Sequence, residues 1–437
     1  MSASREVAID ALVRVEGGAY AHVLVPRLLA RRRGLSARDR AHVTELVHGT
    51  IRMQRALDHQ LAQVSARPLP DLDPVVRAAL RLGAYQLHSG VAPHAAVAET
   101  VAAVPARARG YVNGVLRALA RRGPPWPWPA GDGVEAVGVR TSHPDWIVET
   151  LVRELGRDDA LRTLALADQP PPVTLRVNPL RASVEEVERE LRAGGARVGR
   201  GALVPDALVV HGAGDVGALP AVRDGRATPQ DQASQAVVAA LDPRPGERVL
   251  DVAAAPGGKA GAAAERMGDT GLVLAADRHP GRARTVARAV ARLGLRGVRV
   301  AVADGRQLPV RTGAFDRVLL DAPCSGLGVL RRRPDARWRV RPGDVEALAG
   351  LQRALLLEAA RAVRPGGRLV YSVCTLTAAE TVAIDEFAAE ALGDFVALAP
   401  PPAPWVPLGR GARLAPCAAG TDGMYVLVLE RAASGPG

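Results

Sequence analysis

Two of the three cysteines stand in short segments that could carry nucleophilic chemistry. Cys324 lies in D-A-P-C-S-G (residues 321–326), Cys374 lies in Y-S-V-C-T (residues 371–375), and Cys417 is the third. An odd number of cysteines in a chain of 437 residues argues against a disulfide framework, so reduced thiols are expected. A thiolate is a nucleophile, although a buried free cysteine is often only a small apolar filler. The two cysteines are far apart in sequence and no histidine cluster accompanies them, so no metal is expected.

Three aspartates follow apolar segments in a pattern that suits a nucleoside cofactor. Asp251 precedes A-A-A-P-G-G-K (residues 253–259), where small residues allow backbone amides to approach a ligand at a helix N-terminus. Asp277, 26 residues after Asp251, can accept hydrogen bonds from both hydroxyls of a ribose, and Asp304 could meet an adenine amine. A tight turn and solvated strand ends are the structural alternative. Lys259 is the only lysine of the chain.

These residues must be positioned by short apolar strands, which alternate with helical segments beyond Gly225. Such alternation is typical of a doubly wound parallel sheet, in which ligands bind beyond the carboxyl ends of the strands. The strands are predicted at residues 248–252, 271–276, 298–303, 316–320, 368–372 and 425–430. All three aspartates and both cysteine segments are therefore expected at one crevice.

The chain before this region divides at its prolines and glycines. Apolar residues recur at helical spacing from residue 5 to 122, which predicts an all-helical domain over 1–122. The segment 123–133 cannot continue a helix because proline removes a donor and fixes the backbone angle, and we expect a linker over 123–141. A small connecting α+β unit is expected over 142–222, before an α/β core over 223–432. The connecting unit is predicted to have helices at 146–155 and 184–193 and strands at 173–177 and 207–210.

Charge and hydropathy restrict the class of protein. The formal net charge is +12, and residues 1–122 carry 18 arginines and no lysine against nine acidic residues. This asymmetry suits binding to a phosphate backbone, and a solvated arginine-rich face is the alternative. No stretch of eighteen residues lacks charge and the N-terminus has no secretory apolar core, so a cytoplasmic protein without a membrane partner is expected.

The ordered motifs together resemble those of RNA cytosine carbon-5 methyltransferases. The resemblance rests on D-V-A-A-A-P-G-G-K, A-D-R-H-P, A-D-G-R, D-A-P-C-S-G-L-G-V-L-R-R-R-P-D and Y-S-V-C-T, and also on R-V-N-P, Q-D-Q-A-S and T-D-G-M-Y outside the core. Residues 80–87 and 111–117 resemble the NusB-like helical domain of the ribosomal RNA small subunit methyltransferase B (Sun/Fmu) branch. The likeness covers nearly the whole chain. It implies a Rossmann-like class I methyltransferase core with a mostly parallel seven-stranded sheet, preceded by the α+β unit and the NusB-like domain.

The resemblance also implies a reaction and a cofactor, S-adenosylmethionine. Cys374 would attack carbon 6 of a cytosine, so that carbon 5 becomes nucleophilic and can take the methyl group. Cys324 would assist removal of the carbon 5 proton and release of the enzyme. Asp321 could contact the cytosine edge or the cofactor. The cofactor residues implied are Ala253, Ala254, Ala255, Pro256, Gly257, Gly258, Lys259, Asp277, Asp304 and Asp321.

This chain departs from the family pattern at three positions. Relatives commonly carry cysteine at Ala253, threonine at Ala260 and threonine at Val373. None of these departures removes a reacting group, so they affect only cofactor packing and the hydrogen bonds around Cys374.

The sequence leaves open the identity of the target and the roles of Arg176, Asn178 and the arginine run at 331–333. The helical domain favours small-subunit (16S) ribosomal RNA, with transfer RNA or large-subunit (23S) ribosomal RNA as alternatives, and the protein is expected to be a monomer. A noncatalytic RNA-binding assembly factor and a DNA cytosine methylase, in which Cys324 would attack, are the other classes. Arg176 and Asn178 could orient RNA or brace the core. The run at 331–333 could be a phosphate clamp or a solvated loop.

Overall fold

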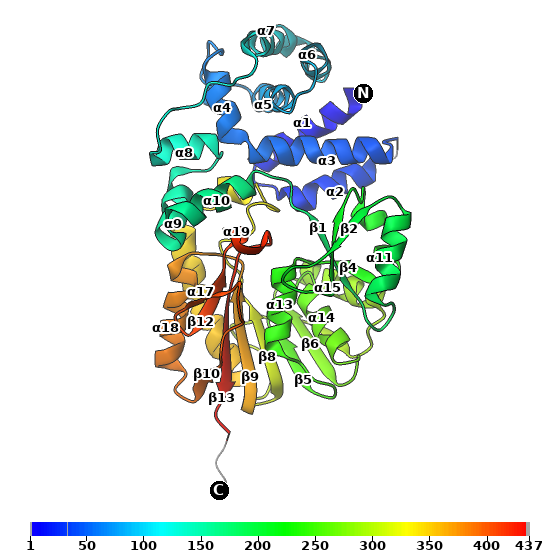
Figure 1. Ribbon diagram of the computed structural model, residues 1–437, viewed down its shortest axis with the longest axis vertical. Coiled ribbons are helices and arrows are strands. Elements are labelled where there is room, and N and C mark those ends of the chain that lie inside the picture. Colours follow the sequence, from blue (N-terminus) through cyan, green and yellow to red (C-terminus); the bar gives the residue numbers. More distant parts are fainter. Residues whose placement is uncertain (1, 33, 434–437) are drawn as a thin grey trace. The chain divides into compact units, whose positions relative to one another are not determined.

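The structure is a computed structural model that describes residues 2–32 and 34–433, and the chain forms two compact units. The first unit contains the chain up to Pro170 together with a returning segment, Leu330–Arg339. The second contains Pro171–Val329 and the chain from Val340 onward. Figure 1 follows the chain through both units by colour.

The first unit is built from helices whose apolar faces form one core. Leu46, Leu57, Leu80 and Leu116 are among its most deeply buried side chains. The helices expected over residues 5–122 are present as α1–α7. The helices of this unit are α1 (Ser2–Glu16), α2 (Ala21–Arg31), α3 (Ala37–Arg52), α4 (Gln54–Ala62), α5 (Pro74–His88), α6 (Pro93–Ala102), α7 (Ala106–Arg122), α8 (Val134–Arg140), α9 (Asp145–Leu155), α10 (Arg157–Ala167) and α16 (Ala336–Arg339).

Local sequence signals start and stop these helices. The Ser36 hydroxyl accepts from the Asp39 N–H at 3.1 Å and the Asp39 carboxylate accepts from the Ser36 N–H at 3.2 Å, a reciprocal cap that begins α3. Proline opens α5 and α6, where its missing N–H costs nothing. Residues 123–133 contain no helix or strand, while α8 forms inside the range expected as a linker. Helix α9 matches the helix predicted over 146–155, α10 was not predicted, and both group with the first unit and not with the connecting unit.

The returning segment Leu330–Arg339 contributes a buried cation, Arg337, to the first unit. The Arg337 side chain has no exposed surface and donates to the carbonyl oxygens of Arg52 and Ser142, both at 3.0 Å, and to the Asp168 carboxylate at 3.1 Å. The Trp338 indole donates to the Ile51 carbonyl at 2.8 Å. Burial raises the pKa of Asp168 to about 6, although Arg337 opposes the shift. Ten residues from late in the sequence thus complete a structure formed by the first 170.

The second unit begins with a small antiparallel sheet in the order β2-β3-β1-β4. Its elements are β1 (Val173–Val177), α11 (Val184–Ala193), β2 (Arg197–Arg200), β3 (Ala207–His211), α12 (Pro220–Arg223) and β4 (Ala227–Pro229). The helix over 184–193 and the strand over 173–177 agree with the predicted bounds. Strand β2 was not predicted because its side chains are largely exposed and half arginine, and β4 extends this sheet beyond the expected boundary at residue 222.

The large sheet of the second unit carries the predicted site residues at its strand ends. Its order is β11-β12-β13-β9-β8-β5-β6-β7, and β10 pairs with β13. Pairs β5–β6, β6–β7, β5–β8 and β8–β9 are parallel, whereas β13 runs antiparallel to β9. The strands are β5 (Arg248–Asp251), β6 (Leu272–Asp277), β7 (Val298–Val302), β8 (Phe315–Asp321), β9 (Val363–Val373), β10 (Phe395–Ala397), β11 (Val406–Leu408), β12 (Gly411–Leu414) and β13 (Met424–Arg431).

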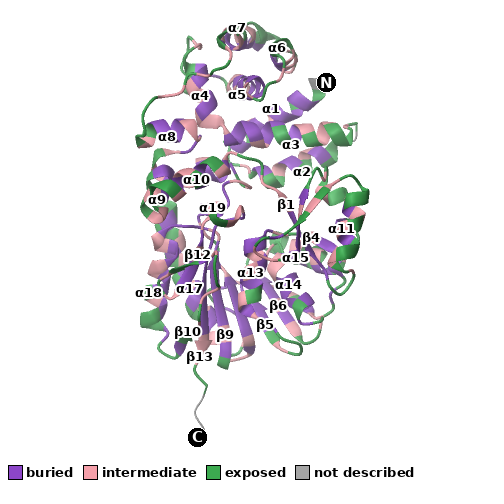
Figure 2. Ribbon diagram, viewed as in Figure 1, coloured by how far each residue is buried: buried purple, intermediate pink, exposed green. Residues whose placement is uncertain are grey.

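Helices pack on both faces of this sheet. Its central strands are accordingly coloured largely as buried in Figure 2. One face packs against α13, α14 and α15, and the other against α17 and α18. These helices are α13 (Gln232–Leu241), α14 (Gly258–Arg266), α15 (Pro280–Leu293), α17 (Pro342–Ala362) and α18 (Val382–Ala391), with the short turn α19 (Pro416–Ala419) before β13. The α/β, Rossmann-like fold is confirmed.

The strand count differs from the prediction of seven. Among the described residues the sheet has nine strands: the six that were predicted by residue range, and β10, β11 and β12, which extend the edge beside β13. These strands have three or four residues each, which is too short for an alternating apolar pattern to identify them.

Replacing Arg337 tests the contribution of the returning segment. Arg337→Met should lower the free energy of unfolding by about 3–5 kcal/mol, because Asp168 would lose its buried cation partner. Urea denaturation followed by circular dichroism measures the change. The control is Arg38→Met on an exposed position of α3, which should change stability by less than about 0.5 kcal/mol. Equal stability of the two variants would contradict the assignment.

Candidate active site

The parallel pairing of β8 and β9 brings the two cysteine segments together. Asp321 at the end of β8 lies opposite Ser372 near the end of β9, so the residues that follow both strands emerge side by side. The sulfur atoms of Cys324 and Cys374 are 3.3 Å apart, a contact between two thiols. The Cys374 carbonyl accepts from the Gly328 N–H at 3.0 Å, which ties the two segments together again.

A lysine–aspartate pair lies beside this contact. The Lys259 ammonium donates to the Asp321 carboxylate at 2.7 Å, and the Ser372 hydroxyl donates to the other Asp321 oxygen at 2.8 Å. Burial alone would lower the pKa of Lys259, but Asp321, Cys374 and Asp251 together raise it. The only lysine of the chain is therefore held as a cation near the Cys374 sulfur.

Asp251 is a buried carboxylate at the end of β5. Its side chain is almost fully buried, and neither oxygen accepts a well-formed hydrogen bond from the described residues. Burial and the Asp321 charge raise the pKa of Asp251 to about 7, although Lys259 and the Ala253 backbone N–H oppose the shift. A carboxyl group left in this state is suited to a polar ligand that supplies donors.

The loop between β5 and α14 approaches the same edge of the sheet with its backbone. The Ala254 N–H donates to the Ala276 carbonyl at 2.8 Å and the Gly257 N–H to the Ala254 carbonyl at 2.7 Å. Gly257 adopts φ +104°, a left-handed conformation that favours glycine, and α14 begins at Gly258. Between these positions Ala255 and Pro256 present only small apolar surface, so a ligand can reach the backbone.

Asp277 is the last residue of the next strand in the sheet, β6, and Asp304 follows the strand after it, β7. The Asp277 carboxylate accepts from the His279 N–H at 2.9 Å and lies 3.2 Å from the Arg282 guanidinium. Asp304 is half-buried, and its hydrogen bonds from the Arg306 side chain and backbone hold its pKa well below the usual range. Three acids on neighbouring parallel strands, next to a loop of small residues, fit a nucleoside bearing a cationic group.

Arg176, Asn178 and Arg331, which were candidates for RNA contacts, form hydrogen bonds within the protein. The Arg176 guanidinium forms two hydrogen bonds of 2.8 Å with the buried Glu265 carboxylate, and the Asn178 amide donates to the Gly225 carbonyl at 3.2 Å. Both residues therefore brace the core of the second unit. In the run at 331–333, Arg331 donates to the Pro170 carbonyl at 2.9 Å within the first unit.

A carboxylate that was not predicted from the sequence, that of Glu380, lies behind the cysteines. Glu380 is fully buried and accepts hydrogen bonds from residues beside Cys324. It lies in the 3-10 turn Ala378–Glu380, six residues after Cys374. The signal available in the sequence was a single acid in a mostly apolar segment after Y-S-V-C-T, which does not distinguish a buried carboxylate from a solvated one.

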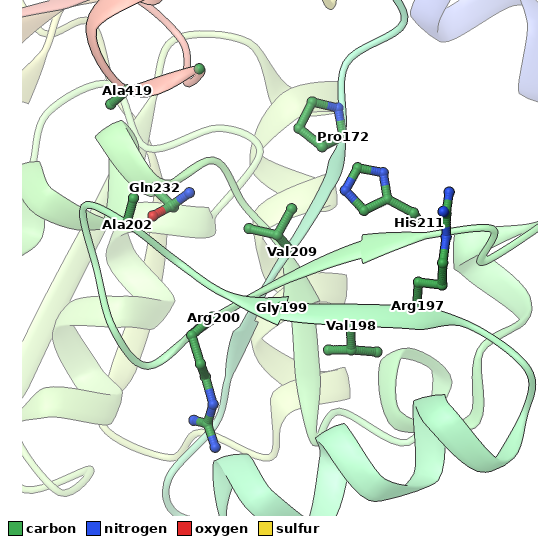
Figure 3. Close-up of a pocket in the computed structure, with 11 residues that line it drawn as sticks. Pro172, Arg197, Val198, Gly199, Arg200, Ala202, Val209, His211, Gln232 and Ala419 are labelled. Atoms are coloured by element: carbon green, nitrogen blue, oxygen red, sulfur yellow. The ribbon is translucent and has the colours of Figure 1, made fainter.

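A separate cavity of about 550 Å³ lies along the small sheet (Figure 3). Strands β2 and β3 contribute Arg197, Val209 and His211 to its wall, and the α19 turn contributes Ala419. None of the predicted site residues lines it. Within the described residues, no group of three or more metal-ligating side chains is arranged around a common point, and no helix is both long and apolar enough to cross a membrane.

Solved structures define the class of protein. The crystal structure of PH0851 is 28% identical, covers 99% of both chains and superimposes with a TM-score of 0.85. A methyltransferase homolog protein from Pyrococcus horikoshii is 27% identical over 69% of this chain and 100% of its own, with a TM-score of 0.60. The fold is that of a methyltransferase.

Sequence comparisons define the family. Residues 238–430 match the 16S rRNA methyltransferase RsmB/F family, residues 2–121 the NusB family and residues 143–217 the ferredoxin-like domain of RsmF/B-like methyltransferases. A Bacillus subtilis protein named "Probable ribosomal RNA small subunit methyltransferase B" is 36% identical over 385 residues, or 86% of each chain. The chain belongs to this RsmB/F family. It is an RNA methyltransferase whose methyl donor is S-adenosylmethionine.

The buried acid of β5 makes the stability of the ligand-free protein depend on pH. Because folding raises the pKa of Asp251 to about 7, its contribution to stability is complete below about pH 4 and is lost as the pH rises toward 7. Asn at this position does not titrate. The free energy of unfolding of Asp251→Asn relative to wild type should therefore increase by about 2–3 kcal/mol between pH 5 and pH 8.

Chemical denaturation at both pH values measures this difference. The matched control is Asp206→Asn, an exposed carboxylate, whose difference from wild type should stay constant. A constant difference for Asp251→Asn as well would mean that this carboxyl titrates normally in the folded protein.

Proposed function

We propose that this enzyme methylates carbon 5 of a cytosine in 16S ribosomal RNA through a covalent bond to Cys374. The observation that carries the proposal is the 3.3 Å contact between the Cys324 and Cys374 sulfurs, beside the Lys259–Asp321 pair. Two thiols and a partly buried cation at one strand edge suit a reaction that adds a nucleophile to a ring and later removes it.

The Cys374 thiolate attacks carbon 6 of the cytosine and forms a carbon–sulfur bond. The ring electrons move to carbon 5, which is otherwise a poor nucleophile. S-adenosylmethionine supplies an electrophilic methyl group. The Lys259 ammonium stabilises the Cys374 thiolate before attack, because its charge interacts with that sulfur.

Cys324 serves the second half of the reaction. After methylation, carbon 5 carries both a methyl group and its original proton, and the adduct persists until that proton leaves. With Cys324 assisting, the proton leaves carbon 5, its electron pair restores the ring double bond and the Cys374–carbon 6 bond breaks. The 3.3 Å contact supports this division of labour, since one thiol stands next to the bond that the other must release.

The cofactor residues follow from the edge of the sheet. Asp277 accepts hydrogen bonds from the ribose hydroxyls, Asp304 lies near the adenine, and the backbone of Ala253–Gly258 approaches the rest of the nucleoside. Asp321 and Lys259, which form an ion pair, contact the cofactor or the cytosine edge. Within the part of the chain that the structure describes, the Asp251 oxygens accept no well-formed hydrogen bond, which supports a donor-bearing ligand here.

The same proposal includes the domain boundaries, the role of the N-terminal domain, the location of the protein and its oligomeric state. A NusB-like domain over 1–122, with its excess of arginines, binds the RNA backbone, and the linker over 123–141 precedes a connecting unit over 142–222. The methyltransferase domain spans 223–432. The protein acts as a cytoplasmic monomer without a metal, and a cytosine that is single-stranded or flipped out reaches the thiols.

Replacing each cysteine separately tests the mechanism. Cys374→Ala should lower turnover by at least about a thousandfold and form no covalent RNA complex, because the attacking sulfur is gone. Cys324→Ala should also lose turnover but accumulate protein covalently bound to RNA. Denaturing gels with labelled RNA and cofactor detect the complex. The opposite pattern would assign attack to Cys324, as in DNA cytosine methylases, and would refute the proposed mechanism.

Mapping 5-methylcytosine tests the target. Deleting the gene should remove a 5-methylcytosine from 16S ribosomal RNA, and the wild-type gene, but not the Cys374→Ala variant, should restore it. Loss of the modification from transfer RNA or 23S ribosomal RNA instead would redirect the proposal to that target. No change in any RNA, together with no cofactor binding by calorimetry, would favour a noncatalytic assembly factor.

A further inference from the structure

A buried hydrogen-bond network joins the two cysteine segments one residue beyond each sulfur. The Thr375 and Ser325 hydroxyls are 2.7 Å apart, and the Ser325 hydroxyl donates to the Glu380 carboxylate. The Ser325 N–H also donates to Glu380, at 2.8 Å. Since Ser325 follows Cys324 and Thr375 follows Cys374, the network fixes the backbone on both sides of the thiol pair.

The Glu380 carboxylate is the centre of this network. Besides Ser325, it accepts from the Thr377 hydroxyl at 2.9 Å and from the Gln352 amide at 3.0 Å. The Tyr371 hydroxyl lies within hydrogen-bond distance of both the Gln352 side-chain oxygen, at 3.0 Å, and the Glu380 carbonyl, at 2.8 Å. Four hydrogen-bond donors thus surround this carboxylate in a fully buried site.

The charges around the two sulfurs are unequal. Glu380 and Asp321 place negative charge near Cys324, whereas the Lys259 ammonium interacts with Cys374. The hydrogen bond to Cys374, burial, and the charges of Cys374, Glu380 and Asp321 raise the pKa of the Cys324 thiol well above its usual value. The other titratable groups nearby are Asp251, which interacts with Lys259, and Tyr371, which interacts with Cys324 and Glu380.

We propose that Glu380 is a positioning residue that holds the two thiols in contact and keeps the proton on Cys324, so that Cys374 carries the thiolate. The role of Cys374 as nucleophile rests on the proposed function. The proton distribution does not, because it is a property of the free enzyme. In this arrangement the Cys324 S–H donates to the Cys374 sulfur, and no electron is transferred.

Alkylation of the free enzyme tests the proton distribution without RNA or cofactor. Iodoacetamide reacts with thiolates, so the pH at which the initial rate is half-maximal reports when each thiol ionises. Peptide mass spectrometry separates the three cysteines, and Cys417 is an internal reference. In wild type, Cys374 should reach its half-maximal rate at a lower pH than Cys324. The reverse order would overturn the proposal, and this measurement needs no variant.

Glu380→Gln removes the charge while keeping the shape of the side chain. The half-maximal pH of Cys324 should fall by about one unit, so the preference for Cys374 at neutral pH should drop about tenfold. The matched control, Glu386→Gln, makes the same change at an exposed position of α18 and should leave the order intact. Unchanged values in a folded Glu380→Gln protein would overturn the role of the charge.

Ser325→Ala separates the network from the charge. It removes the link to Thr375 but leaves Glu380 ionised and bound to the residue 325 N–H. The alkylation order should therefore persist, while kcat falls at least about tenfold with an unchanged KM for RNA and unchanged cofactor affinity. An unchanged kcat would overturn the positioning role. If wild-type enzyme shows the expected alkylation order but Cys374→Ala still forms the RNA adduct, the proposed function fails while this inference stands.

Discussion

The parallel register between β8 and β9 is the constraint on which the site depends. Each strand ends in a short turn that carries one cysteine. Because Asp321 pairs with Ser372, the two turns lie side by side. Because the side-chain period of a strand is two, a slip of one residue would send one of the two turns to the other face. The apolar residues of both strands, buried between helix layers on each face, specify that register. Reactivity thus depends on ordinary strand packing.

Several charged side chains lie close together at the carboxyl ends of these strands, where they are partly or fully buried. Asp251, Asp321 and Lys259 lie close together, and a lone carboxylate in this place would be costly. The lysine offsets part of that cost, and the four donors around Glu380 do the same for the carboxylate behind the thiols. A site assembled in this way is preorganised, because its charges are held by the protein before a substrate arrives. Burial disfavours the charged form of Asp251, and a ligand that donates hydrogen bonds to this carboxylate would reduce that cost.

Much of this could be predicted from the sequence, for identifiable reasons. The central strands are short apolar segments that end in, or are soon followed by, Asp251, Asp277 or Asp304, so their ends and their shared edge were predictable. The short edge strands β10, β11 and β12 were not, because three or four residues carry no period. Glu380 and Arg337 were missed for another reason. A charged side chain is exposed by default, and only tertiary contacts with Ser325, Gln352 or Asp168 make burial favourable.

The returning segment Leu330–Arg339 affects how the protein matures during synthesis. The cavity that Arg337 fills is formed by residues from the first 170 of the chain, yet the side chain that fills it is translated far later. Domains usually fold in the order in which they leave the ribosome. Here the buried residues of the apolar core lie between Val7 and Leu119, so they are all made early. The buried ion pair between Arg337 and Asp168 can form only after most of the second unit has been translated, and translation therefore separates the closing of the apolar core from the closing of this polar contact.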